Sequence, residues 1–479
     1  MLSGVAWASA AKWSTQIIAW ASTIVVARIL GPSDFGLITM AGVFLGVVTM
    51  LSEFGVGSAV VTMRELPPAE LRQLNALAVL LGLAGSLLTA LMAYPLGLFF
   101  RAPELPPVLL VVGLTFLLSS LQSVPAALLR RELRFRTLAT IDAARGLLVP
   151  VVTLVGALLG LRYWALALGS VIGAGVTAAL TLYHRRVPFA RPRRDGLTRV
   201  LHFSRHLLVG RIAWVVYENG DFAVAGRRLS QGAVGDYSLA WTLAISPIEK
   251  ITMVLSDVTP SLFSAVQHNR PELKRYLLNL TEILCLVTMP ASVGLALVSH
   301  DLVAVLLGAK WSGAAAPLSL LAVYAGVRPM TGLFGHVFLA TRDTRFMMWM
   351  SVAWAVLLLT GFIVGSSWGP IGIAAAWLII HPVLALSSLA RVRRLLDLSG
   401  ADYFRALRLG LDGAATMALA VLAFQLFLAP SWSPTVRLVA SILLGAATYV
   451  LATWLLHRAR LAQILEWLRR VRRGGAAAA

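Results

Sequence analysis

Charged residues are scarce in this sequence. Asp, Glu, Lys and Arg make up 13% of its 479 residues, about half the share that a soluble domain carries. Hydrophobic residues make up 58%, and the mean hydropathy is +0.81. A soluble chain of this size could not cover its surface with so few charges, so a soluble enzyme or binding domain is excluded. The composition predicts a protein surrounded by lipid.

Cysteine and the usual catalytic motifs are also lacking. The single cysteine, Cys285, can form neither an intrachain disulfide nor a thiolate metal cluster. The sequence has no glycine-rich phosphate loop, no nucleophile elbow and no metal-binding helix motif. His336 and His381 lack a second ligand at metal-binding spacing. We therefore expect no metal, no cofactor and no enzymatic reaction. Any transport must then draw on an ion gradient, the membrane potential or a substrate gradient.

The net charge of +20 arises from short loops between apolar stretches. The even-numbered connections and the C-terminal tail carry about four times as many Lys and Arg residues as the odd-numbered connections, which is the pattern of positive-inside topology. This bias places both termini in the cytoplasm. The sequence shows no basic helix face with interleaved aromatic residues, so no nucleic-acid partner is expected.

The apolar stretches predict about fourteen transmembrane helices, because each is about 20 residues long or longer. The alternating strand pattern of an outer-membrane barrel is absent. We expect an all-α integral membrane protein with two six-helix lobes in a parallel repeat and two C-terminal helices. The expected divisions are an N-lobe (1–183), a basic cytoplasmic linker (184–198), a C-lobe (199–395), two further helices (396–457) and a basic cytoplasmic tail (458–479).

The segment Ala27–Leu37 has a counterpart later in the chain. Its Gly31-Pro32 pair ends one predicted helix, and Ser33 or Asp34 can cap the next. Six predicted spans, an even number, separate the two copies, so both repeats have the same orientation across the membrane. Repeats of this kind place the substrate path between them. A shift of 199 positions superimposes Arg28, Leu30 and Gly36 on Arg227, Leu229 and Gly235.

Several charges lie inside predicted spans, where a charged group is costly unless it faces a partner or a wet cavity. Arg211 and Arg328 have no acid within one turn of their own helices, which favours a role as substrate-binding cations in a cavity. Lys12, Arg205, Glu249 and Lys250 have two interpretations, because such side chains can also snorkel to the headgroups. Glu53 and Asp257 are either helix-packing polar contacts or a coupling-ion or substrate site. Glu218 and Asp221 are further candidates for coupling or cavity acids.

Two motifs resemble a known family. The run from Arg28 to Leu37, followed by Phe54-Gly-Val-Gly-Ser-Ala, is similar to the opening of bacterial polysaccharide exporters, and Leu306–Trp311 is similar to their segment before the tenth span. These exporters are the Wzx-type lipid-linked oligosaccharide flippases of the multidrug/oligosaccharidyl-lipid/polysaccharide (MOP) superfamily, and the closest resemblance is to the colanic-acid-exporter-like branch. The resemblance implies two lobes that alternate between inward- and outward-open states around a cationic cavity.

Three hypotheses for function follow. The first is a flippase in a bacterial inner membrane that moves oligosaccharide on an undecaprenyl pyrophosphate carrier to the periplasmic leaflet. Membrane lipid and the polysaccharide polymerase machinery are its expected partners. The second is a cation-coupled drug or metabolite antiporter of the same superfamily, in which Glu53 and Asp257 would be essential. The third is a membrane glycosyltransferase or polymerase, which the short odd-numbered loops disfavour.

Overall fold

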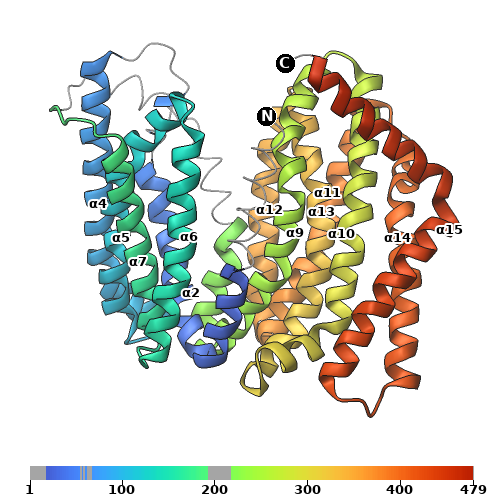
Figure 1. Cartoon of the computed structure of the whole chain (residues 1–479), viewed down its shortest axis with the longest axis horizontal. Helices are drawn as coiled ribbons and strands as arrows, with labels where there is room; N and C mark the ends of the chain where they lie inside the picture. Colours follow the sequence, from blue (N-terminus) through green and yellow to red (C-terminus); the bar gives the residue numbers. More distant parts are fainter. Residues whose placement is uncertain (1–17, 54–56, 58–59, 62–66, 192–216, 478–479) are drawn as a thin grey trace. The chain divides into compact units, whose positions relative to one another are not determined.

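The computed structural model describes residues 18–53, 57, 60–61, 67–191 and 217–477. Every regular element among these residues is helical, which confirms the predicted all-α class (Figure 1). Two helices cover residues 18–29 and 217–228, and twelve longer α-helices complete the fourteen. Within the described ranges, ten segments are long and apolar enough to cross a membrane. Helix α9 (Gln231–Ala265) is not among these ten.

The chain forms two compact units, Met1–Ser238 and Leu239–Ala479. The longer helices of the first unit are α2 (Pro32–Glu53), α4 (Pro68–Phe100), α5 (Leu105–Arg131), α6 (Phe135–Leu158) and α7 (Tyr163–His184). Proline lies in the first turn of α2, α4 and α5, where a missing N–H costs nothing. Asp34 in the first turn of α2 accepts a hydrogen bond from the Gly31 N–H at 3.0 Å.

The second unit holds most of α9 and all the later elements. The elements after α9 are α10 (Arg270–Leu306), η1 (Ala309–Ala314), α11 (Ala315–Ala340), α12 (Thr344–Gly365), η2 (Ser366–Trp368), α13 (Gly369–Leu396), α14 (Gly400–Ala423), η3 (Phe424–Leu428) and α15 (Pro434–Ala477). Asn269 caps the start of α10 by accepting a hydrogen bond from the Glu272 N–H. Ser399 caps the start of α14 in the same way by accepting from the Asp402 N–H.

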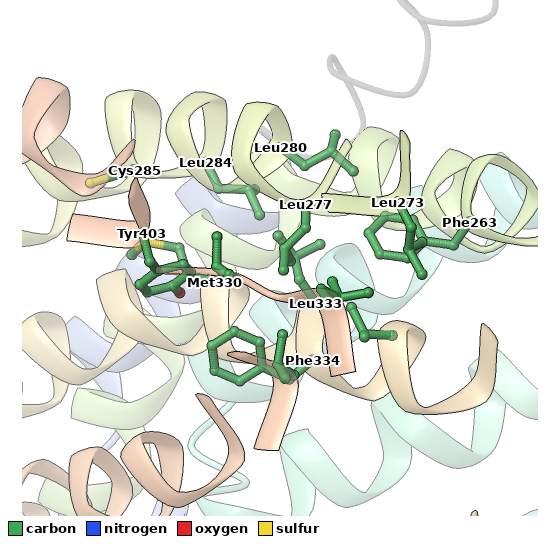
Figure 2. Close-up of a cluster of buried hydrophobic side chains, with 14 of the residues drawn as sticks. Phe263, Leu273, Leu277, Leu280, Leu284, Cys285, Met330, Leu333, Phe334 and Tyr403 are labelled. Atoms are coloured by element: carbon green, nitrogen blue, oxygen red, sulfur yellow. The ribbon is translucent and has the colours of Figure 1, made fainter. Parts of the chain in front are cut away.

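The main core of the second unit lies between α10 and its neighbours. Leu273, Leu277, Leu280 and Leu284 recur at helical spacing on α10 and are almost fully buried. Figure 2 shows this stripe beside the α11 side chains of the same cluster. The whole buried cluster draws on α9, α10, α11, α13 and α14, so these helices are held as one packed body.

Two ion pairs fasten α15 to α10. Arg437 donates from Nε and Nη2 to the two carboxylate oxygens of Asp301, and Arg460 donates to both oxygens of Glu282 at 2.8 and 2.9 Å. Both acids are buried, and both pairs are two-pronged, which is the stronger arginine–carboxylate geometry. Helices α14 and α15 also pack side by side (Figure 1). The C-terminal helix pair is thus fixed to α10.

Replacing Arg460 by alanine should destabilise this attachment. The change leaves the Glu282 carboxylate, which is 2% exposed, without its charged partner. Breaking a buried ion pair in this way costs up to ~5 kcal/mol, and we expect about 2 kcal/mol because Arg460 itself is half exposed. The measurement is the melting temperature of the purified protein in detergent. Arg405→Ala, which removes an exposed arginine, is the matched control, and equal melting temperatures for the two variants would contradict this account.

Candidate functional site

The structure describes some of the predicted site residues and not others. Lys12, Arg205 and Arg211 lie outside the described residues. The backbones of Glu53 and Asp257 are helical, in α2 and α9, but their side chains are outside the description. Their roles therefore remain predictions. The side chains of four predicted site residues are described: Glu218, Asp221, Lys250 and Arg328.

Arg328 lies at the middle of α11 and pairs with Glu249. About twelve residues of α11 separate it from either end of the helix, roughly 18 Å at 1.5 Å per residue. Its Nη1 donates to Oε1 of Glu249 at 2.9 Å, and Glu249 is itself near the middle of α9. The Arg328 side chain is 21% exposed and that of Glu249 is 58% exposed. A charge pair at this depth is far from either headgroup layer, so snorkelling does not explain it.

The exposed side of this pair must face water. An ionised carboxylate at the centre of the hydrocarbon layer is strongly unfavourable, and intramembrane charges face protein interiors or water-filled paths. Glu249 is more than half exposed on the second unit. Lys250, the next residue on α9, is half-buried and has no ion-pair partner within the described part of the chain. Among the described side chains, two cations and one acid therefore gather at mid-depth on this unit.

Three helix prolines surround the pair. Pro247 lies two residues before Glu249, Pro329 follows Arg328, and Pro382 follows His381 on α13. Each proline removes one backbone hydrogen bond from its helix and bends it. Prolines in membrane helices are tolerated where neighbouring groups satisfy the freed backbone, which is common where helices line a functional path.

The turn of α11 that carries Arg328 is held by its neighbours. The Thr331 hydroxyl donates to the Arg328 carbonyl at 2.8 Å, so its oxygen accepts from Nε2 of His381 at 3.3 Å. This assigns the proton of His381 to Nε2. The His381 ring is buried against Tyr324 and Trp354, with ring centroids 4.9 and 4.7 Å away. The base of the Arg328 side chain is therefore rigid.

Asp221, on the first unit, has the surroundings of a structural acid. It is fully buried; one carboxylate oxygen accepts from the Tyr237 hydroxyl at 2.7 Å and the other from the Phe222 N–H at 2.8 Å. Glu218, one turn earlier, is half-buried and makes contacts of its own. The geometry around Asp221 favours helix packing over ion coupling, although both interpretations of these acids remain predictions.

A substitution separates the two interpretations of Asp221. Asparagine keeps an oxygen that can accept from Tyr237 and removes the charge, so Asp221→Asn should retain most activity if the residue only packs helices. Asp221→Ala should lower the amount of folded protein, because it removes the carboxylate that accepts from the buried Tyr237 hydroxyl, a loss of about 1–3 kcal/mol. Protein level by immunoblot and transport activity check both. Loss of transport by the folded asparagine variant would instead indicate a coupling role.

The two copies of the repeated segment meet each other inside the first unit. A side chain added at Gly36 would lie 1.9 Å from the Gln231 carbonyl oxygen, and one added at Gly235 would lie 1.8 Å from the Pro32 carbonyl oxygen. The contact is reciprocal, because Pro32 and Gln231 are also related by the 199-residue shift. Glycine at both places lets the starts of α2 and α9 touch backbone to backbone.

Further contacts tie the same region together. Arg227 donates to the Phe99 carbonyl at 2.9 Å, and Gln231 donates to Glu104 at 3.2 Å. Residues 217–238 therefore pack with the helices of the first repeat, although the sequence repeat assigns them to the second. The odd-numbered connections lie at this end of the helices, which the charge bias assigns to the periplasmic side.

Sequence reasoning left Glu249 between two interpretations and did not connect it with Arg328. Its partner Arg328 lies 79 positions away in sequence, so no helical spacing connects the two. The available signal was their shared context, since each lies within two residues of a proline and near the middle of a predicted span. Charges beside mid-span prolines would have selected Glu249, Arg328 and His381 together.

Comparisons with known proteins agree with this architecture. Residues 25–316 match the family model described as "Polysaccharide biosynthesis protein". The lipopolysaccharide biosynthesis protein WzxC of Escherichia coli K12 is 26% identical over 398 residues, which cover 79% of each chain. The succinoglycan biosynthesis transport protein ExoT of Rhizobium meliloti 1021 is 24% identical over 473 residues, covering 97% of this chain and 95% of its own.

Solved structures share the fold at low identity. The lipid II flippase MurJ, in an inward closed conformation, superimposes with a TM-score of 0.73 at 14% identity, covering 95% of this chain and 99% of its own. An inward-facing multidrug resistance transporter of the MATE family, in the MOP superfamily, gives a TM-score of 0.62 at 17% identity, covering 81% and 96%. These likenesses concern the fold alone.

Proposed function

Because this chain belongs to the polysaccharide biosynthesis protein family, a family of membrane transporters and not of enzymes, we propose that it is a lipid-linked oligosaccharide flippase. It moves a polyprenyl-pyrophosphate-linked oligosaccharide from the cytoplasmic to the periplasmic leaflet of a bacterial inner membrane. The transported unit then enters surface polysaccharide synthesis. The hypothesis of a glycosyltransferase or polymerase is set aside, since the family does not consist of enzymes.

The observation that carries the proposal is the cation site at mid-depth. Arg328 presents its guanidinium near the centre of α11, and Lys250 lies on the facing helix α9. A pyrophosphate carries several negative charges and oxygens that accept paired hydrogen bonds, so a guanidinium binds it strongly. Substrate sites at the bilayer midplane are the rule in repeat-built transporters.

The proposed movement uses the parallel repeat. The N-lobe (1–183) and C-lobe (199–395) alternate between states open to the cytoplasm and to the periplasm, and the basic linker between them stays in the cytoplasm with both termini. The Gly36–Gly235 contact joins the two copies of the repeated segment at the end assigned to the periplasm, and in this proposal it opens in the outward-open state. Opening this contact would release the glycan-bearing headgroup.

Lipid-linked oligosaccharide in a strain lacking this gene tests the proposal. Extracted lipids are sized by mass spectrometry, and surface glycan is measured in parallel. A complete polyprenyl-pyrophosphate repeat unit should accumulate while surface glycan is lost, because synthesis continues and translocation stops. An unchanged lipid-linked pool together with increased drug susceptibility would contradict the flippase and favour the antiporter.

A further inference from the structure

Three ion pairs that join helices of the second unit are of two kinds. The pairs of Arg437 with Asp301 and of Arg460 with Glu282 are two-pronged, and their acids are buried. Arg328 and Glu249 are joined by a single hydrogen bond, and the acid is the exposed partner. The first kind fixes helices together. The second kind has the geometry of a contact that opens.

Glu249 is the partner that is free to move. Its side chain is 58% exposed, whereas that of Arg328 is 21% exposed. The turn of α11 below Arg328 is held by the Thr331–His381 contact and the surrounding rings. No comparable contact restrains the Glu249 side chain within the described residues. The backbone that carries Arg328 is therefore held in place, while the exposed Glu249 carboxylate can rotate away.

The exchange is also favourable electrostatically. One hydrogen bond to an exposed carboxylate adds little stability, because water screens the charge and the long side chain loses entropy. A diphosphate brings more charge and can engage the guanidinium with two oxygens at once. An anionic headgroup can thus replace Glu249 on Arg328, and Glu249 can return when the headgroup leaves.

We propose that Glu249 is a built-in competitor for the anionic headgroup: it occupies Arg328 in the unloaded transporter, yields to a prenyl diphosphate on binding and returns to drive release. The inference rests on the proposed function and assigns a residue that sets affinity and turnover at the same site. It explains why an acid lies beside a cation that binds an anion. Weak binding is useful here, since a carrier must also let go.

The test is binding of farnesyl diphosphate to the purified full-length protein in detergent, by isothermal titration calorimetry. Glu249→Gln should bind the probe at least about tenfold more tightly than the unmodified protein, because the competitor loses its charge. Glu249→Asp keeps the charge and should bind as the unmodified protein does. Export in cells should fall for Glu249→Gln in spite of the tighter binding, because release becomes slow.

Controls separate this inference from a structural role and from the proposed function. Asp343→Asn removes a comparable acid from Arg391 outside the site and should change neither binding nor export. Arg328→Gln should bind at least about tenfold more weakly, and adding Glu249→Gln to it should bring no gain. If the Glu249→Gln variant does not fold, Glu249→Ala replaces it in the binding measurement, because alanine also removes the charge.

The outcomes are distinct. If Glu249→Gln binds as weakly as the unmodified protein or more weakly while Arg328→Gln loses binding, the competitor role is wrong and the flippase proposal stands. If Arg328→Gln binds the probe as well as the unmodified protein does, the cation site itself is wrong. If no variant binds the probe, both fail.

Discussion

Replacing Arg328 by glutamine is expected to reduce export of the surface glycan by about 100-fold without removing the protein from the membrane. Glutamine keeps a polar side chain of similar length but loses the charge and the forked geometry that suit a diphosphate. Losing a charge-assisted hydrogen-bond partner of the bound diphosphate is expected to cost about 2–5 kcal/mol, and ~2.7 kcal/mol corresponds to this factor. Glu249, the partner that remains, is exposed and can be hydrated, so folding should tolerate the change.

The comparison is with Arg405→Gln. Arg405 is an exposed arginine that pairs with Asp402 on its own helix, and neutralising it should leave export unchanged. Protein amount is measured by immunoblot of membrane fractions, and export by quantifying surface polysaccharide. Full export by Arg328→Gln at normal protein level would show that the mid-depth cation does not bind substrate.

Locking the contact between the two repeat copies should stop transport. Position 232 offers a suitable pair with position 33, because a Cβ added at Gly232 would lie 3.6 Å from the Ser33 Oγ. We expect Ser33→Cys with Gly232→Cys to form a disulfide on oxidation and to lower export more than tenfold. A reductant should restore export. The expectation follows because the contact must open in every cycle of alternating access.

The cross-link is detected by cutting the chain between the repeats. A protease site inserted into the linker 184–198 separates the halves on a gel unless the disulfide joins them. The native Cys285 is buried and does not compete. Each single cysteine variant is a control and should export normally. A fully cross-linked protein that exports at the normal rate would contradict a moving contact at Gly36 and Gly235.

The fold was largely predictable, since a bilayer leaves few choices. Backbone polar groups in hydrocarbon must be satisfied within helices, so apolar stretches of sufficient length predict the helices directly. The break at Gly31-Pro32 and the equivalence of Gly36 with Gly235 also followed from the sequence. Helix α15 runs to Ala477 with a kink at His457, next to the predicted start of the basic tail at residue 458.

The site was less predictable, because its partners come from different helices. Arg328 has no acid near it along α11, and its pairing with Glu249 depends on how α9 and α11 pack. The contact between Thr331 and His381 likewise joins two helices, α11 and α13, and the two residues are 50 positions apart in sequence. Hydropathy and helical spacing describe one helix at a time. They identified Arg328 as an intramembrane cation, but they could not identify its partner on another helix.

Transport by the purified protein tests the central claim most directly. The protein is reconstituted into vesicles that contain the lipid-linked oligosaccharide identified in the deletion strain, and an added glycan-cleaving enzyme that cannot cross the bilayer reports the outer-leaflet fraction over time. The account predicts that the protected fraction becomes accessible with the unmodified protein and stays protected with Arg328→Gln. Equal accessibility in vesicles with and without the protein would contradict the account.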